Sequence, residues 1–405
     1  MNQPSVQLNQ PRARIIIHIG QHKTGSKALQ SFLAQHAQGL LQHGILYPLE
    51  PYSRQTGPAY ANSHYRLFAL LRGEAMLACA DSNRAQRFQS QQRKFCHPYT
   101  SAQAMFKAIE VERLRCGANT ILVSAEDLFD MHTAHESGFC MEWLNSGIGL
   151  LAKQVKDFNY EPVIVAYLRR QDHLLAAHYI QYIKGNSSAD LDFGSFSTAF
   201  EQRLQTWELL QPWETAFGHA SMVLRPYEPA AIPLDVISDF FAKILGFPMP
   251  PDWTLPLKDR EAVNATPNRD YVEFMRKFGR KKNLWPPAFR RKDVLDAALS
   301  DSAHYSQSTG TAAWLSPAER RALLARHAED NRQIAACFLD RPGHNLFAEA
   351  IPEDDEHWQA YAGLSPGRTN AIKRNVRQSR NRRRMQAIWH LGTTVALWLR
   401  KLFGK

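Results

Sequence analysis

The chain has 405 residues, of which 44% are hydrophobic, so it can bury a substantial core. Its formal net charge is +11 at pH 7, and its five scattered cysteines form no C-x-x-C pair. This cysteine usage argues against a disulfide framework and against a cysteine-ligated metal site, and it suits a reducing compartment. The polar segment 1–10 lacks the apolar run of a secretory signal, and we expect residues 1–14 to be a flexible N-terminus of a cytoplasmic protein.

The first predicted element is a buried strand over residues 15–19, followed by a tight turn and an amphipathic helix. The turn contains two glycines, a lysine and two hydroxyl residues. Free backbone N–H groups at the start of such a helix attract an anion, so the turn predicts a phosphate site. The residues that we assign to this site are Gly20, Gln21, His22, Lys23, Thr24, Gly25, Ser26 and Lys27.

The order of the residues in this turn distinguishes it from the nucleoside triphosphate loop G-x-x-x-x-G-K-[ST]. Here Lys23 precedes Gly25 instead of following it. The turn resembles the 5′-phosphosulfate loop of sulfotransferases that use 3′-phosphoadenosine-5′-phosphosulfate (PAPS). The resemblance implies that PAPS is the donor and that Lys23 stabilises the negative charge on the departing phosphate. It also implies that no metal ion is required.

A third strand is predicted over residues 120–124, and it ends just before Glu126 and Asp127. Side chains at the carboxyl ends of parallel strands line a crevice, so Glu126 is a candidate for the base that accepts the proton of an acceptor hydroxyl. His64, which follows the extended segment 44–48, is the other candidate, because an imidazole titrates near neutral pH. The sequence leaves both open. Asp127 is expected to cap a helix that begins there.

A further apolar strand over residues 163–168 ends in Arg169 and Arg170. In sulfotransferases an arginine at this strand end, and a serine eight residues later, contact the 3′-phosphate of the donor. The resemblance assigns the arginine role to Arg169, whose planar guanidinium suits phosphate oxygens. The serine position is Ala177, so one hydroxyl donor is missing, and either Arg170 or His178 replaces it or the donor binds less tightly.

The last predicted strand covers residues 221–226 and precedes a Tyr-Glu pair. In related enzymes the tyrosine of this pair lies at the adenine of the donor, and the resemblance assigns that role to Tyr227. Motifs near residues 315–320, 330–331 and 345–347 resemble the closing helices of bacterial carbohydrate sulfotransferases. The resemblance therefore extends over residues 15–358.

The excess positive charge is confined to the end of the chain. Residues 368–405 contain eleven lysines and arginines and no acidic residue, which leaves 38 basic and 38 acidic residues elsewhere. We expect residues 368–384 to be a solvated basic segment. The residues that follow predict an amphipathic helix, which lies on an anionic membrane or, alternatively, packs on the domain. Nucleic acid is the least favoured partner. The apolar positions of this helix are Ile388, Leu391, Val395, Trp398 and Leu402.

Together these features predict an α/β fold: a three-layer P-loop-like domain with a mostly parallel central sheet flanked by helices, and a helical C-terminal part. The predicted organisation is a sulfotransferase domain over residues 15–365 and a basic tail with a C-terminal amphipathic helix over 366–405. The predicted activity is sulfuryl transfer from PAPS to a carbohydrate hydroxyl at the inner face of the cytoplasmic membrane. An ATP-dependent kinase and a non-catalytic membrane-associated protein on a decayed sulfotransferase scaffold are the alternatives.

Overall fold

The fold is taken from a computed structural model of the chain. The residues that the structure describes are 12–49, 51–52, 63–185, 189–228, 235–253, 267–279, 291–301, 314–339, 345–349 and 360–403. Most of the segment 1–14, which we expect to be a flexible N-terminus, lies outside the described residues.

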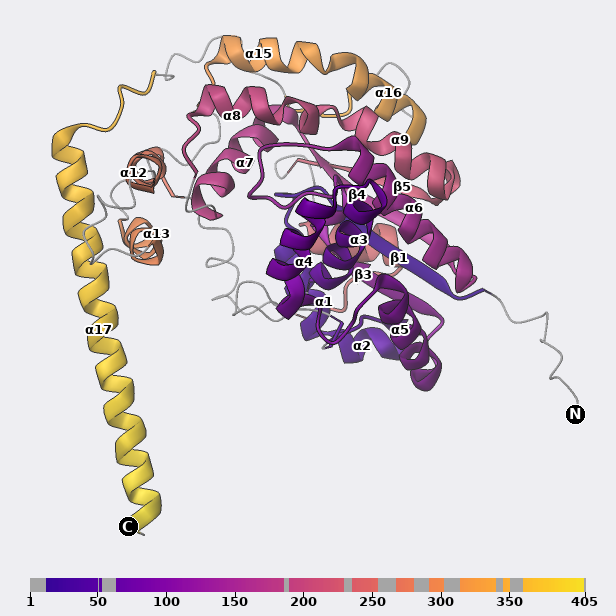
Figure 1. Ribbon diagram of the computed structural model, residues 1–405, viewed down its shortest axis with the longest axis horizontal. Helices are drawn as coiled ribbons and strands as arrows, with labels where there is room; N and C mark the ends of the chain where they lie inside the picture. Colours follow the sequence, from indigo (N-terminus) through magenta and orange to yellow (C-terminus); the bar gives the residue numbers. More distant parts are fainter. Residues whose placement is uncertain are drawn as a thin grey trace, which may run out of the picture. The chain divides into compact units, whose positions relative to one another are not determined.

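The described strands form a five-stranded, wholly parallel sheet with the strand order β2-β3-β1-β4-β5 (Figure 1). The sequence analysis predicts four of these strands, and all four are confirmed within three residues of the predicted ends. β2 has only two residues and lies within the segment 44–48, which is expected to be extended but is not among the predicted strands. The strands are β1 (Arg14–Gly20), β2 (Ile45–Leu46), β3 (Thr120–Ser124), β4 (Glu161–Arg169) and β5 (Met222–Tyr227).

The strands are apolar along their length because helices cover both faces of the sheet. Successive side chains of β1 point to opposite faces, so Ile15 and Ile17 join one buried cluster and Ile16 joins the other. The first cluster includes residues of α3 (Tyr65–Ala78), α5 (Ala102–Cys116), α6 (Met141–Asp157) and α9 (Thr206–Phe217), and the second includes residues of α1 (Ser26–Gln35) and α10 (Val236–Phe240). The parallel α/β architecture of the prediction is therefore confirmed.

Figure 1 shows the helices of the described residues. In the first two-thirds of the chain they are α1 (Ser26–Gln35), α2 (Ala37–Gln42), α3 (Tyr65–Ala78), α4 (Ser82–Cys96), α5 (Ala102–Cys116), α6 (Met141–Asp157), α7 (Gln171–Gly185), α8 (Phe193–Phe200), α9 (Thr206–Phe217) and α10 (Val236–Phe240). In the last third they are α12 (Arg269–Gly279), α13 (Arg291–Ser300), α15 (Pro317–Arg326), α16 (Ala328–Phe338) and α17 (Pro366–Phe403). A π-helical turn, η4 (Phe241–Leu245), continues α10.

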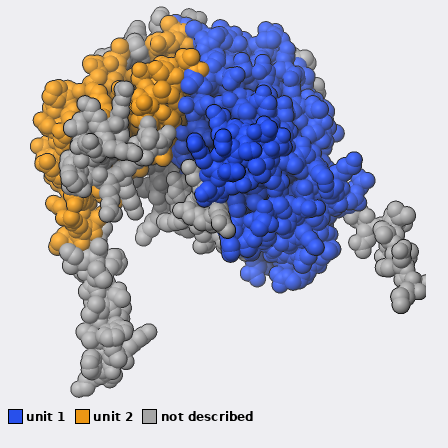
Figure 2. Space-filling model, viewed as in Figure 1, with its two compact units in different colours: residues 1–175, 199–264, 320–351 blue, residues 176–198, 265–319, 352–405 orange. Residues whose placement is uncertain are grey.

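The chain divides into two compact units, drawn in blue and orange in Figure 2. The first comprises residues 1–175, 199–264 and 320–351 and contains the whole sheet. The second comprises residues 176–198, 265–319 and 352–405. The division runs through the span 15–365, which the sequence analysis treats as one domain.

Within the second unit, α17 packs against α12 and α13. Ile372 and Val376 are fully buried, and Ser379 is 5% exposed. The segment 368–384, which we expect to be solvated, is therefore part of a helix that begins at Pro366 and buries one side, whereas Arg374, Arg377, Arg382 and Arg384 are exposed. No helix in the described ranges combines the length and the apolar character needed to cross a bilayer.

Candidate functional site

The turn between β1 and α1 has a backbone that requires glycine at two positions. Gly20 has a φ of +112°, and an added Cβ there would lie 3.0 Å from the carbonyl oxygen of Glu126. Gly25 has a φ of +83°, and its Cβ would lie 3.0 Å from Val236 Cγ1. Lys23 also adopts a positive φ, of 67°. Both glycines are therefore required by backbone conformation and by close neighbours.

The same turn is held by hydrogen bonds that leave the start of α1 open. The Gln21 N–H donates to the carbonyl of Tyr167 on β4 (2.9 Å), and the Thr24 hydroxyl donates to the carbonyl of Gln21 (2.7 Å). Gly25 occupies the N-cap position, and no side chain in the described residues caps this helix end. The first amide groups of α1 are thus directed at the turn, where a negative charge is favoured.

Arg169, at the end of β4, joins this turn to β5. Its Nη1 donates to the carbonyl of Lys23 (2.5 Å), and its backbone N–H donates to Gln21 Oε1 (3.0 Å). The guanidinium carbon lies 5.7 Å from the ring centroid of Tyr227. Burial lowers the pKa of Arg169, with the nearby acidic groups opposing it. The structure therefore brings together three residues that are far apart in the sequence.

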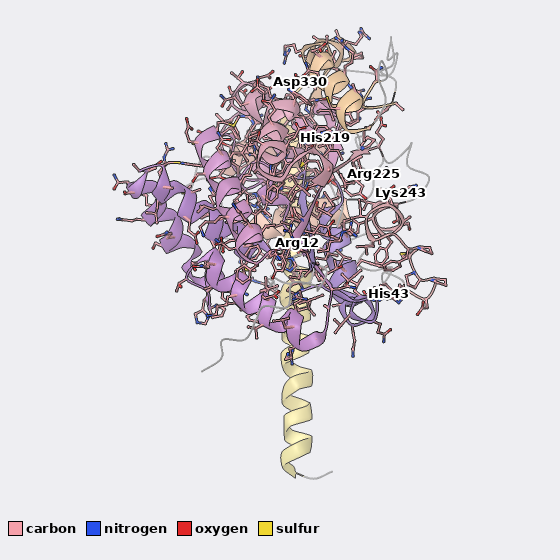
Figure 3. The ribbon with its side chains drawn as sticks, turned by 90° about the vertical axis from the view of Figure 1, so that its right-hand side faces the viewer. Arg12, His43, His219, Arg225, Lys243 and Asp330 are labelled. Atoms are coloured by element: carbon pink, nitrogen blue, oxygen red, sulfur yellow. The ribbon has the colours of Figure 1, made fainter. Side chains whose placement is uncertain are left out.

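The β5 side of this cluster is fixed by a buried carboxylate. Arg225, labelled in Figure 3, donates to Asp239 of α10 through Nε (3.0 Å) and Nη2 (2.5 Å). The hydroxyl of Tyr167 donates to the same carboxylate (2.8 Å). This network fixes the start of α10, so that Val236 packs against Gly25 and Tyr227 lies 3.7 Å from the position of a Cβ at Gly25.

Glu126 lies at the end of β3, beside the turn, in a chain of polar side chains. The Gln30 Nε2 group of α1 donates to Glu126 Oε2 (2.6 Å) and also to the hydroxyl of Ser124 (3.1 Å). That hydroxyl also lies 2.8 Å from His18 Nδ1. Sequence reasoning missed Gln30, Ser124 and His18 because none belongs to a motif. Ser124, as the last residue of a buried strand, carried a usable signal.

The two neighbouring carboxyl groups of η1 (Glu126–Leu128) have pKa values shifted in opposite directions. Burial raises the pKa of Glu126, but His22, the Gln30 amide and Lys27 outweigh it, so the pKa is lowered overall. Burial raises the pKa of Asp127 well above its ordinary value, and the charge of Glu126 adds to this effect. Of the two, Glu126 is therefore the more readily ionised. Neighbouring carboxyl groups whose pKa values are shifted in opposite directions are typical of sites that transfer protons.

The expectation that Asp127 caps a helix is wrong. Asp127 lies inside η1, whose N-cap is Ala125, and its Oδ1 is 3.7 Å from Nε2 of His22. His22 is 5% exposed, and its Nε2 donates to the carbonyl of His132 (3.1 Å). Burial lowers the pKa of His22, and its imidazole is a buried support of the turn.

His64, the other candidate base, is fully buried and held by the backbone on both sides of its ring. Nδ1 accepts from the N–H of Ser124 (3.0 Å), and Nε2 donates to the carbonyl of Pro48 (2.9 Å). Burial lowers its pKa to about 4. The ring lone pair that a base needs is already used, and this geometry does not favour His64 as the proton acceptor.

Arg170 lies beside Arg169 in the sequence but has different neighbours. It is 3% exposed, and its Nε and Nη2 donate to both oxygens of Asp172 (2.8 and 3.0 Å). Nη1 donates to the carbonyl of Glu349 (2.7 Å), and Arg320 also contacts Asp172 (2.8 Å). This geometry does not favour Arg170 as a replacement for the serine missing at residue 177. Ala177 itself is buried on α7, at 6% exposure.

The described residues contain no group of three or more histidine, cysteine or acidic side chains that could hold a metal ion. Comparison of the chain with protein-family models, with curated proteins and with solved structures gave no match in any of the three.

Proposed function

We propose that this protein is a PAPS-dependent sulfotransferase, with a three-layer P-loop-like fold. The observation that carries the proposal is the convergence of Lys23, Arg169 and Tyr227 at the carboxyl ends of β1, β4 and β5. These are the three positions to which the sequence resemblance assigns contacts with the leaving phosphate, the 3′-phosphate and the adenine. A crevice at the carboxyl ends of parallel strands is where α/β folds bind nucleotides.

In this proposal the turn binds the 5′-phosphosulfate group. The amide groups at the start of α1, together with Thr24 and Ser26, donate to its oxygens, and Lys23 supplies positive charge. This charge acts most strongly as the bond to the bridging oxygen breaks, because negative charge then accumulates on the phosphate. A bound 3′-phosphate also offsets the burial that lowers the pKa of Arg169.

We assign the base to Glu126 in preference to His64. Glu126 is ionised at neutral pH, partly exposed, and located at the edge of the turn. The ring nitrogens of His64 are both occupied by backbone groups. In the proposed step the acceptor oxygen attacks sulfur in line with the departing phosphate oxygen, and Glu126 takes the proton of the acceptor hydroxyl. The sequence resemblance indicates that the acceptor is a carbohydrate.

The experiment that tests the donor is a comparison of ligands by thermal unfolding. Adenosine 3′,5′-bisphosphate, the product of the reaction, should raise the melting temperature, and a ligand at 100 times its Kd stabilises a protein by about 2.7 kcal/mol. ATP with Mg²⁺ should have a much smaller effect. The Arg169→Ala variant should lose the response to the bisphosphate. A response to ATP alone would favour the kinase alternative and contradict the proposal.

Transfer itself requires a second measurement, because a decayed scaffold could bind the donor without reacting. Sulfur-labelled PAPS is incubated with a panel of polysaccharides and glycolipids, and labelled product is separated by chromatography. Label transferred to a glycan by the wild type, and not by Lys23→Ala, supports the proposal. Donor binding without transfer to any glycan of a broad panel would favour the non-catalytic alternative, which Ala177 suggests.

A further inference from the structure

The long helix α17 of the second unit has two different sides. The side that faces α12 and α13 carries Ile372, Val376 and Ser379, all buried. Positions in an α-helix are about 100° apart, so these three residues fall within about 60° of the circumference. This side holds α17 to the rest of the unit.

Two arginines of α17 belong to the packed side. Arg368 pairs with Asp270 of α12 (2.8 Å) and with Asp301 (3.1 Å). Arg383 pairs with Asp293 of α13 (3.1 Å) and also with Asp296. The positive charge of these two arginines is therefore matched by acidic groups of the same unit.

The opposite side of α17 carries basic residues that face solvent. They fall within about 160° of the circumference, centred opposite Ile372 and Val376. Met385, on the same side, is 67% exposed. The exposed basic residues are Arg374, Arg377, Arg382 and Arg384, and we call them the arginine stripe.

The helix continues beyond the arginine stripe for 19 residues, to Phe403, which is about 28 Å. The sequence becomes apolar over this stretch. The helical period places positions 388, 391, 395 and 402 within about 40° of the direction of Arg377 and Arg384. These positions are occupied by Ile, Leu, Val and Leu. By the helical period, the basic residues and the apolar positions that follow them therefore share one side of the helix.

We infer that α17 binds the surface of an anionic lipid membrane through the arginine stripe and the apolar positions that follow it. A basic segment next to an apolar helical face is the combination that binds negatively charged headgroups and inserts among acyl chains. The residues 368–405 contain no acidic side chain that would repel such a surface. A nucleic-acid partner would use the basic residues but would leave the apolar positions without a role.

This inference does not depend on the proposed sulfotransferase activity, and its test needs no turnover. The full chain is sedimented with vesicles of phosphatidylcholine, with and without phosphatidylglycerol, at low and at high salt. The wild type should bind the anionic vesicles only, and high salt should weaken binding because it screens surface charge. Equal binding to both vesicle types would overturn the inference.

The decisive variant changes the whole arginine stripe to glutamine. About 1 kcal/mol for each basic residue near an anionic surface corresponds to about five-fold per arginine, so vesicle affinity should fall several-hundred-fold. A matched control removes the same number of positive charges from exposed sites of the first unit. The substitutions in this control are Arg87→Gln, Lys107→Gln, Arg115→Gln and Lys156→Gln.

Thermal unfolding of both variants checks that each is folded, since none of the eight residues lies in the buried clusters. The control should bind anionic vesicles nearly as well as the wild type. Equal losses in the two variants would mean that net charge, and not α17, determines binding, and would overturn the inference. The same holds if the wild type binds duplex RNA tightly, as measured by fluorescence anisotropy, and does not bind anionic vesicles.

Discussion

Lys23 lies in a turn where its backbone φ of 67° is maintained by the flanking glycines and by Arg169. We expect Lys23→Ala to lower the rate of sulfuryl transfer by about 10²–10³-fold, the effect typical of removing one preorganised electrostatic group. Lys107→Ala, at an exposed position of α5, is the matched control and should transfer at the wild-type rate. Rate measurements with labelled PAPS make the comparison. Turnover of Lys23→Ala close to wild type would exclude the assigned role.

Gln30 donates to Glu126 at 2.6 Å and lowers the pKa of that carboxyl group. Gln30→Leu should therefore raise the pKa of Glu126, and the acid limb of the pH–rate profile should move to higher pH. Glu126→Gln should lower turnover by about 10²–10⁴-fold at every pH, because the proposed proton acceptor is lost. A purely structural Gln30 would change the rate without moving the acid limb, and that result would contradict the assignment.

His64 is buried in its neutral form, with a pKa of about 4, whereas in the unfolded chain its pKa is about 6.5. Between these values the unfolded state binds more protons, so the free energy of unfolding should fall as the pH falls from about 6.5 to about 4. His18 and His132 act in the same sense, and the raised pKa of Asp127 acts in the opposite sense.

His64→Gln isolates this contribution, because the other titrating groups are common to both proteins. The slope of the unfolding free energy against pH should be shallower in the variant than in the wild type over that window. Urea unfolding at a series of pH values measures both slopes. Identical slopes would show that His64 is not held neutral in the folded protein.

At the scale of elements, the position of α1 depends on the turn that precedes it. Gly25→Ala should lower the free energy of unfolding by about 1–2 kcal/mol, because alanine is strained in the left-handed conformation. The close contact between the new Cβ and Val236 should lower the free energy of unfolding further. The substitution should also weaken binding of adenosine 3′,5′-bisphosphate, because the first amide groups of α1 are displaced.

Gly246→Ala is the control for this prediction. Gly246 has φ and ψ of 83° and 14°, close to the 83° and 5° of Gly25, but a Cβ there meets nothing within 4 Å. Gly246→Ala should lower the free energy of unfolding only by the cost of the left-handed conformation and should leave ligand affinity unchanged. Urea unfolding and calorimetric titration separate the two effects. Equal ligand affinities in both variants would contradict the role given to the turn.

At the scale of the whole molecule, the buried contacts described for α17 come from residues before Arg384. Removal of residues 386–405 retains these contacts, and we expect it to leave the melting temperature close to that of the wild type. Ile372→Ala, which removes a fully buried side chain, should lower the free energy of unfolding by about 2–5 kcal/mol. Calorimetry of the three proteins tests this. A large destabilisation by the truncation, comparable to that of Ile372→Ala, would contradict it.

The sequence by itself determined the parallel sheet and the turn after β1. Long apolar runs and the Gly20–Ser26 pattern depend on local backbone preference and on burial, which are readable along the chain. The sequence also located the excess positive charge in the final 38 residues.

Only the tertiary structure decided which polar side chains contact the turn and which are buried in structural hydrogen bonds elsewhere. Arg169 and Arg170 are neighbours in sequence, yet one contacts the turn and the other is buried against Asp172. The sequence left His64 and Glu126 both open as candidates for the base, and their hydrogen-bond partners in the structure distinguish them. Hydrogen-bond partners and desolvation come from residues distant in the chain, so a linear pattern cannot specify them.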